Sequence, residues 1–519
     1  MIITLKKFPY RYLPYEERLL IEEAGSLGDV VSREERSVQV RAEGAAGTTE
    51  SLIQRLHRLT YFSHFSVGNG AQLPTQQFLF ETTANGSRTA ARQSTRYSTH
   101  GFHEYKGKFH PQIARYLMSQ TGLAMDSVVF DPFAGSGTVL VEALHFGCNA
   151  IGVEANPLAV LVANSKLKLL SSPERELKSF KCVVDDSIQN LSSAKGPDAY
   201  ATALKLSEAH REYLHSWFAP RVLGKLLKFR FDCRKELSSS WACAADVLLS
   251  SIAREVSHQD PADLRIRRRK KPLQDAPVEE LLAENASTVT NRALGARNLL
   301  GHRSAVTEVF LGDSRNSSRD VQRRLLAIGR CRIDAVITSP PYATAMPYVD
   351  TSRLSLVLLG LCDPSELKSL ERLQIGNREI SPSERKKAEE SIEERLAELP
   401  KAVRTFVRKL VISLTSSDAG FRKRNMPALL TQYFTDMKEV LAQNYKLIEP
   451  GGLAFWLVGP NKTQLNHEWL QIDTPLWLAD VAESVGFSAS MSPLNAYQRF
   501  GLHQRNGIRE EFLLTLLRN

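Results

Sequence analysis

Several patterns that would assign a protein class at once are missing from this sequence. Its six cysteines are scattered and form no C-x-x-C pair, so neither a zinc site nor a disulfide framework is expected, and a reducing, cytoplasmic compartment is the default. No apolar run approaches the roughly 18 residues of a membrane span, and Met1–Lys7 does not read as a signal peptide. No internal repeat is visible. We therefore expect no metal site and no membrane partner.

The composition is that of a globular protein with a basic bias. Hydrophobic residues make up 43% and charged residues 24% of the 519 positions, and this length predicts two or three domains rather than one core. The net charge is 67 − 57 = +10. An excess of cations suits a polyanionic partner, although charge alone is a weak indicator.

A glycine-containing loop follows the first strongly predicted strand. The buried-strand run Val128–Phe130 ends in Asp131-Pro-Phe-Ala-Gly-Ser-Gly-Thr138, a helix follows, and a second strand ends at Glu154. Glycines at 135 and 137 let a ligand approach the backbone, and an acidic residue after the second strand suits a ribose diol. The loop is neither G-x-G-x-x-G nor a P-loop. The alternative is a glycine turn that binds nothing.

A second motif follows another predicted strand. Ala335–Ile337 leads into Thr338-Ser-Pro-Pro-Tyr342, where two prolines remove backbone donors and end the strand. A rigid turn at the carboxyl end of a strand lies where open α/β sheets place their ligands. Its carbonyls and hydroxyl could accept hydrogen bonds from an exocyclic amino group while Tyr342 stacks on the base. The alternative is a simple proline turn.

Together these two motifs resemble those of the S-adenosylmethionine-dependent DNA amino-methyltransferases, which modify N4 of cytosine or N6 of adenine. The resemblance implies that Ser339, Pro340, Pro341 and Tyr342 form the catalytic turn. It also implies a set of residues around S-adenosylmethionine. These are Tyr105, Lys108, Phe109, Pro111, Asp131, Phe133, Gly135, Gly137, Thr138, Glu154, Asn156, Asp313, Ser314 and Thr338. Among them Glu154 would bind the ribose hydroxyls and Asp313, after a third strand, would contact the adenine.

The fold class expected from this resemblance is α/β, with a Rossmann-like seven-stranded methyltransferase sheet, helical inserts and a small N-terminal α/β domain. The predicted catalytic domain comprises residues 96–170, 301–362 and 426–519. Residues 1–95 form the accessory domain, with strands at Ile2–Lys6, Ser37–Arg41 and Gln77–Glu81. Residues 171–300 form a helical insert with a basic arm that is a candidate for target recognition, and residues 363–425 form a charged helical insert. Either insert or the N-terminal unit could read the target sequence. The segment Ala84–Thr99 is predicted to be a linker.

Two basic clusters are candidates for contact with duplex DNA. They comprise Arg265, Arg267, Arg268, Arg269, Lys270 and Lys271 in the first insert, and Arg422, Lys423 and Arg424 in the second. Such dense charge predicts either a solvated loop or an arm that contacts phosphates with little sequence preference.

The choice of target base is open at this stage. Ser339 favours N4 of cytosine within the family, whereas Asp or Asn at that position more often accompanies adenine. A C5-cytosine enzyme is excluded because no cysteine follows a proline. The rivals are an N6-adenine enzyme, an RNA methyltransferase of the tRNA guanine-N2 type, and a non-catalytic DNA-binding subunit. Associated restriction or defence proteins are possible partners.

Overall fold

The computed structural model describes most of the chain in eleven stretches and one single residue. These are residues 1–42, 49–85, 93–105, 109–263, 266–301, 305–344, 348–378 and 380–415, followed by 420–465, 468–496 and 510–519, with the single residue Gly107. No helix among them is long and apolar enough to cross a membrane.

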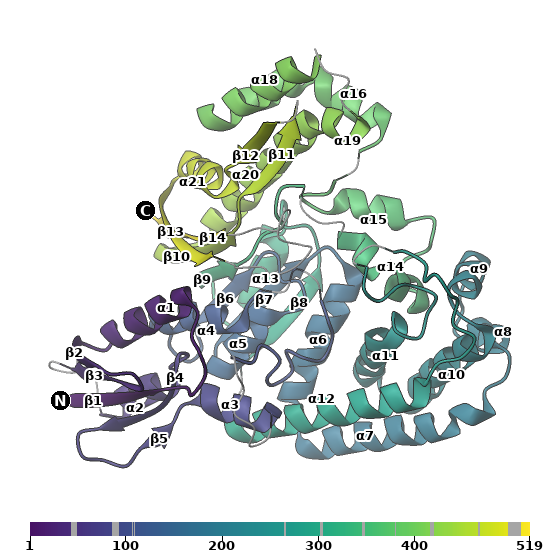
Figure 1. Cartoon of the computed structure of the whole chain (residues 1–519), viewed down its shortest axis with the longest axis horizontal. Helices are drawn as coiled ribbons and strands as arrows, with labels where there is room; N and C mark the ends of the chain where they lie inside the picture. The colour runs from purple at the N-terminus through teal and green to yellow at the C-terminus, as the bar shows by residue number, and fades with distance from the viewer. Residues whose placement is uncertain are drawn as a thin grey trace.

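A seven-stranded sheet forms the centre of the molecule and confirms the predicted α/β class (Figure 1). Its strands in spatial order are β13 (Phe487–Ala496), β14 (Glu510–Arg518), β10 (Ile448–Val458), β9 (Ile333–Thr338), β6 (Val128–Asp131), β7 (Asn149–Glu154) and β8 (Thr307–Leu311). β14 runs antiparallel to both of its neighbours, and the other pairings are parallel. The chain order reverses between β6 and β9, so the carboxyl ends of these two strands form the switch point where such sheets bind ligands.

The N-terminal unit is a five-stranded sheet packed on helices. Its strand order is β2 (Asp29–Arg33), β3 (Ser37–Arg41), β1 (Ile2–Lys7), β4 (Phe62–Val67) and β5 (Leu73–Pro74). The helices are α1 (Pro14–Gly25), α2 (Thr49–His57) and α3 (Gln76–Asn85). The predicted strand Gln77–Glu81 is wrong. It lies in α3, where the Thr75 hydroxyl accepts from the Phe78 amide at 3.2 Å and caps the first turn.

The N-terminal unit shares one hydrophobic core with a face of the central sheet. That face is covered by α4 (Pro111–Gln120) and α5 (Thr138–Phe146), and the Tyr116 hydroxyl donates to Glu22 at 2.7 Å. The end of the predicted linker, residues 97–99, is buried rather than solvated, and Tyr97 packs in this core and donates to Glu142 at 2.6 Å. An apolar ring and a bonded hydroxyl hold this segment against α5.

Helices after β7 form a second core. They are α6 (Pro157–Ser171), α7 (Glu174–Gln189), α8 (Pro197–Ala203), α9 (Glu208–Trp217), α10 (Pro220–Glu236), α11 (Ser239–Ala253) and α12 (Val278–Leu300), with a short 3-10 helix at Asn190–Ser193. After β9 comes α14 (Tyr348–Leu358), which packs against α6, α9 and α11. These helices lie beside the β8 end of the sheet (Figure 1).

The opposite face of the sheet is covered by a third core. Its helices are α13 (Ser318–Ala327), α20 (Met426–Leu447) and α21 (Thr474–Val485). The predicted charged insert contains α15 (Leu367–Leu373), α16 (Pro382–Glu390), α17 (Ile392–Ala397), α18 (Lys401–Thr415) and α19 (Phe421–Arg424). A hairpin of β11 (Asn461–Leu465) and β12 (Glu468–Ile472) precedes α21. The sequence analysis did not predict this hairpin.

Candidate active site

Three strands of the central sheet bring the two sequence motifs to one edge. β6 ends at Asp131, β7 at Glu154 and β9 at Thr338, and these parallel strands are neighbours in the order β9-β6-β7. A cavity of about 280 Å³ lies at this edge. Its lining includes Ser339 from the proline turn together with the glycine loop, so the structure unites motifs that are about 200 residues apart in the chain.

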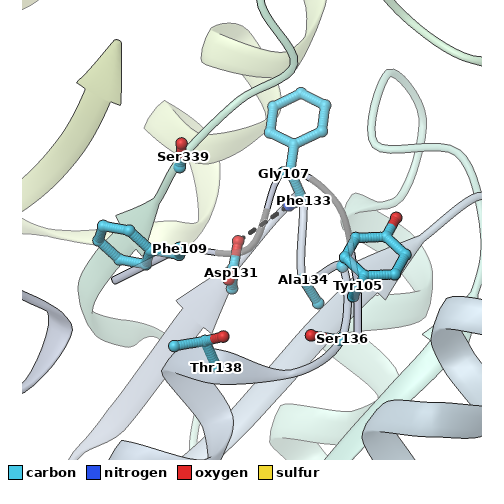
Figure 2. A pocket seen from close by; sticks show the side chains of 10 residues that line it. Tyr105, Gly107, Phe109, Asp131, Phe133, Ala134, Ser136, Thr138 and Ser339 are labelled. Atoms are coloured by element: carbon cyan, nitrogen blue, oxygen red, sulfur yellow. Dashed lines mark hydrogen bonds between the residues drawn. The ribbon is translucent and has the colours of Figure 1, made fainter. Parts of the chain in front are cut away.

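The cavity is walled by side chains from three segments (Figure 2). In this view Asp131 lies in the middle, with Phe109 and Ser339 on one side and Tyr105 and Ser136 on the other. Of the predicted cofactor residues, six line the cavity. They are Tyr105, Phe109, Asp131, Phe133, Gly135 and Thr138.

The two loop glycines have different structural roles. Gly135 has φ +49°, and a Cβ there would lie 3.3 Å from the Tyr105 ring, inside the cavity wall. Gly137 has φ +78°, and a Cβ there would lie 2.8 Å from the Ala163 Cβ of α6. Gly137 therefore permits close packing of the loop on α6 and does not line the cavity, whereas Gly135 keeps the cavity open.

Asp131 connects the cofactor loop to the catalytic strand. Its carboxylate accepts from the Thr338 hydroxyl at 2.6 Å and from the Phe133 amide at 3.0 Å, and it is buried. The pKa of Asp131 is raised to about 7, chiefly by burial. The neighbouring Glu154 adds to the rise, and the two hydrogen bonds oppose it. Thr338 is thus a partner of Asp131 rather than a lining residue, and it couples β9 to β6.

Glu154 is held by backbone amides at the end of β7. Its carboxylate accepts from the amides of Gly135 and Asn156 at 2.9 and 2.8 Å. Burial raises the pKa of Glu154 despite these bonds. The Asn156 side chain caps α6 by accepting from the Leu158 amide at 3.0 Å and donates to Ser352 at 3.1 Å. The structure therefore gives Asn156 a capping role beside the cavity.

The proline turn is positioned by hydrogen bonds from distant elements. Ser339 donates to the Leu457 carbonyl of β10 at 3.1 Å, which leaves its oxygen lone pairs as acceptors. Tyr433 of α20 donates to the Pro341 carbonyl at 3.0 Å. Tyr342 donates to Glu511 of β14 at 2.8 Å, and this bond helps to fix the position of the Tyr342 ring. The hairpin contributes the fourth contact, from the Asn461 amide to the Ala343 carbonyl at 2.6 Å.

Comparison with known proteins agrees with this geometry. The family model described as DNA methylase matches residues 80–165, which contain the glycine loop. A type II methyltransferase, M.MjaII of Methanocaldococcus jannaschii, is 26% identical over 375 residues, covering 57% of this chain and 67% of the relative. M.BsoBI of Geobacillus stearothermophilus, also a type II methyltransferase, is 22% identical over 454 residues, covering 82% and 84%. The chain is thus similar to type II methyltransferases over most of its length and to the DNA methylase family model around the glycine loop.

A third relative is of the same type as the first two. The type II methyltransferase M.MvaI of Kocuria varians is 22% identical over 385 residues, covering 71% of this chain and 78% of the relative. These alignments extend well beyond the segment matched by the family model, so the likeness to methyltransferases spans most of this chain.

The residues after the third strand, Asp313 and Ser314, lie beside the loop but outside the cavity lining. Asp313 forms a bidentate ion pair with Arg315, whose shortest N–O distance is 2.6 Å, and Arg315 also faces Asp436 at 3.2 Å. Ser314 donates to the Pro132 carbonyl and so braces the loop from behind. Pro111 occupies the first turn of α4, also outside the lining. Lys108 lies outside the described residues.

The first basic cluster is partly engaged with the protein itself. Arg268 donates to the Ser216 carbonyl at 2.7 Å and lies 4.4 Å from the Trp217 ring centre. Arg269 donates to the carbonyls of Ser257 and Gln259 at 3.0 Å. These hydrogen bonds hold the basic segment against the rest of the helical insert. The sequence did not predict them.

The rest of the basic positions are more open. Arg267, Lys270, Lys271 and Arg424 are exposed, and Lys423 is half-buried. Arg265 and the side chain of Arg422 lie outside the described residues. Of the exposed positions, Arg267 forms an ion pair with Asp263 at 3.4 Å.

Proposed function

We propose that this protein is a site-specific DNA methyltransferase that transfers a methyl group from S-adenosylmethionine to N4 of a cytosine. The observation that carries the proposal is the Thr338–Asp131 hydrogen bond of 2.6 Å, which holds the glycine loop and the Ser339–Tyr342 turn at one cavity. A cofactor loop and an amine-accepting turn must lie this close for direct transfer, because the reacting atoms need near-contact alignment.

The residues at the cavity fit the proposed cofactor. S-adenosylmethionine, when bound, supplies an electrophilic methyl group on a cationic sulfur. Asp131 and Glu154 are buried carboxylates with raised pKa values, a condition that a cationic ligand relieves. Gly135 leaves a site without a side chain beside them, and Ser136 adds a buried hydroxyl. Asp131, Gly135 and Glu154 would therefore hold the cofactor.

Tyr105 and Phe109 are among the side chains that line the cavity. Its empty space of about 280 Å³ includes volume that is open to solvent. The Tyr105 ring occupies the space over Gly135. We propose that Tyr105 and Phe109 close against the ligand after binding, and that Asp313 reaches its adenine.

The turn supplies what an exocyclic amine requires. That amine is a poor nucleophile because its lone pair is delocalised into the ring. We propose that the Ser339 oxygen and the Pro340 carbonyl accept its two protons and orient it, while Tyr342 stacks on the base. The base must leave the duplex to reach this position. The prolines at 340 and 341 keep the acceptors rigid.

We propose duplex DNA as the partner and the insert at 171–300 as the region that recognises the target. The exposed cations Arg267, Lys270 and Lys271 would contact phosphates there, with Lys423 and Arg424 on the other insert. A companion restriction nuclease or defence protein remains a prediction, as does the cytoplasmic location.

Tritiated S-adenosylmethionine with either duplex DNA or total RNA tests the substrate class. We expect label in DNA alone, and label in RNA alone would contradict the proposal. Ser339→Ala and Tyr342→Ala should abolish most of the transfer while cofactor binding, measured by calorimetry, is retained. A matched control is Tyr445→Phe, because this ring lies behind the sheet against Phe487.

A further inference from the structure

A second, larger cavity adjoins the first. It has a volume of about 540 Å³ and lies between the start of α6, the end of α11, one face of α14 and residues 103–105. Tyr105 lines both cavities, so its ring is the partition between them. The two predicted functional segments that meet here are the helical insert and the helix that follows the catalytic turn.

The lining of this second cavity is rich in hydroxyl groups. Five hydroxyl side chains and one guanidinium face it, and they come from α11 and its C-cap and from α14. These residues are Ser250, Ser251, Arg254, Thr351, Ser352 and Ser355. Such groups donate hydrogen bonds to phosphate oxygens, and they make up much of the phosphate contact set of DNA-binding proteins.

The donors are already oriented by a network. Ser250 donates to Ser355 at 2.8 Å, and the His103 ring nitrogen Nε2 lies 2.8 Å from the Ser250 oxygen. Burial lowers the pKa of His103 to about 4, so the imidazole is neutral at pH 7. Because Ser250 gives its proton to Ser355, the neutral ring must donate at Nε2. The network therefore adds no charge and leaves the guanidinium as the cationic group.

Arg254 is the charged anchor of the cavity. One of its terminal nitrogens donates to the Thr351 carbonyl at 3.1 Å, which ties the insert to α14. A guanidinium has five N–H donors, so this bond uses a minor part of its capacity. The acidic residue of the lining, Glu104, is exposed at the rim. A single carboxylate is a poor ligand set for a divalent cation, which requires several oxygen ligands.

Ser250, Ser251 and Ser352 donate their protons within the protein, to Ser355 and to the carbonyls of Leu248 and Val349. We propose that this second cavity binds a backbone phosphate of the DNA strand that carries the target base, with Arg254 and the Ser355 hydroxyl as the donors to it. The inference rests on the proposed function. A base that enters the turn brings its own sugar-phosphate, and α14 begins a few residues after Tyr342. The phosphate and base sites would thus be built from one continuous segment, and the Asn156–Ser352 bond links both to the cofactor edge.

The test is equilibrium binding of a labelled duplex taken from a fragment that the wild type methylates, in the presence of S-adenosylhomocysteine. For Arg254→Gln we expect a roughly tenfold weaker Kd for duplex, and a slope of log K against log salt that is smaller by about 1. The Kd for S-adenosylhomocysteine should change less than twofold. The matched control is Arg221→Gln, an exposed arginine of the same insert, which should leave all three quantities unchanged.

Two further variants guard against a folding defect. Arg254→Lys keeps the charge, so we expect the wild-type salt slope even if the Kd weakens. Ser355→Ala removes the hydroxyl proposed to donate to the phosphate, so the Kd should weaken a few-fold without change in slope. An unchanged Kd and slope in folded Arg254→Gln would overturn the inference, as would weakened binding of S-adenosylhomocysteine alone. Failure of the proposed function is separate, since the wild type would then place no methyl on DNA.

Discussion

Buried carboxylates occur at two places near the glycine loop, and the two places differ in the charges that surround the carboxylates. Asp131 and Glu154, at the ends of β6 and β7, accept hydrogen bonds from neutral donors. Glu142, on α5, faces Arg115 at 3.3 Å and the His100 ring at 2.7 Å, with His145 at 3.3 Å. All of these side chains are buried.

The difference in surroundings reverses the pKa shifts. Burial raises the pKa of Asp131 and of Glu154, and no cation opposes it among the causes that act on these groups. Burial would raise the pKa of Glu142 too, but His145, His100 and their hydrogen bonds lower it well below its usual value. The Glu142 carboxylate has cationic partners within the protein, whereas among the described residues no cation lowers the pKa of Asp131 or Glu154, and a cationic ligand would supply that counter-charge.

The largest expected effect is on stability, at the network of Glu142 with Arg115, His100 and His145. Glu142→Gln removes the carboxylate that the buried Arg115 faces, and breaking a buried ion pair in this way costs about 3–5 kcal/mol. We expect that loss in the free energy of unfolding measured by urea denaturation. A change below about 1 kcal/mol would show that the network does not hold α5 to the segment 97–100.

Asp131→Asn should leave the stability of the protein intact and weaken cofactor binding instead. An amide oxygen can still accept from Thr338 and Phe133, and removing a buried charge relieves its desolvation cost, so stability at pH 8 should be equal or higher. The cofactor affinity should fall by roughly 10- to 100-fold, since one to two pKa units correspond to that factor. Calorimetry with S-adenosylhomocysteine and S-adenosylmethionine measures it, and wild-type affinity for the cationic ligand would refute the charge argument.

The hydrogen bond between the motifs can be broken alone. Thr338→Val keeps the shape of the side chain but removes the donor to Asp131, at a cost of about 1–2 kcal/mol. We expect a roughly tenfold loss of methyl transfer, because the turn and the loop lose their fixed relation. Duplex binding should be unaffected, and Thr338→Ser, which keeps the hydroxyl, serves as the control.

The pH dependence of cofactor binding should follow the ionisation of Asp131, and near pH 7 its effect should be modest. Asp131 has a folded-state pKa near 7 against an ordinary 3.8, so the cost of ionising it develops as pH rises from about 4 to about 7 and is constant above. A cationic ligand prefers the ionised form. Cofactor affinity should therefore be highest above pH 7 and fall by up to about tenfold per unit below it. Asp131→Asn should show a flat profile over the same range.

The central strands were predictable because buried parallel strands have uninterrupted apolar runs. Val128–Phe130 and Ala335–Ile337 are such runs, and both lie in the confirmed sheet. The strand predicted at Gln77–Glu81 failed because the buried positions Gln77, Phe80 and Glu81 have the i, i+3, i+4 spacing of one helical face, a pattern that five residues are too few to reveal. The β11–β12 hairpin was missed because its sequence is largely polar.

The chemistry of the site was predictable from two sequence motifs, but the hydrogen bonds that hold the proline turn in place were not. Tyr433 lies 92 residues from Pro341, and Glu511 lies 169 residues from Tyr342. A single sequence carries no signal for such long-range hydrogen bonds. The Gly137 prediction shows the same limit, because its neighbour Ala163 becomes apparent only when α6 packs on the loop.

The most direct test of the central claim is the mass of the nucleosides released from DNA after incubation with the protein and deuterated S-adenosylmethionine. We predict N4-methyldeoxycytidine that carries the deuterated methyl group. N6-methyldeoxyadenosine would keep the amino-methyltransferase assignment and correct the base assigned from Ser339. The absence of any labelled nucleoside, with the cofactor shown to bind, would contradict the assignment of Ser339–Tyr342 as the amine site.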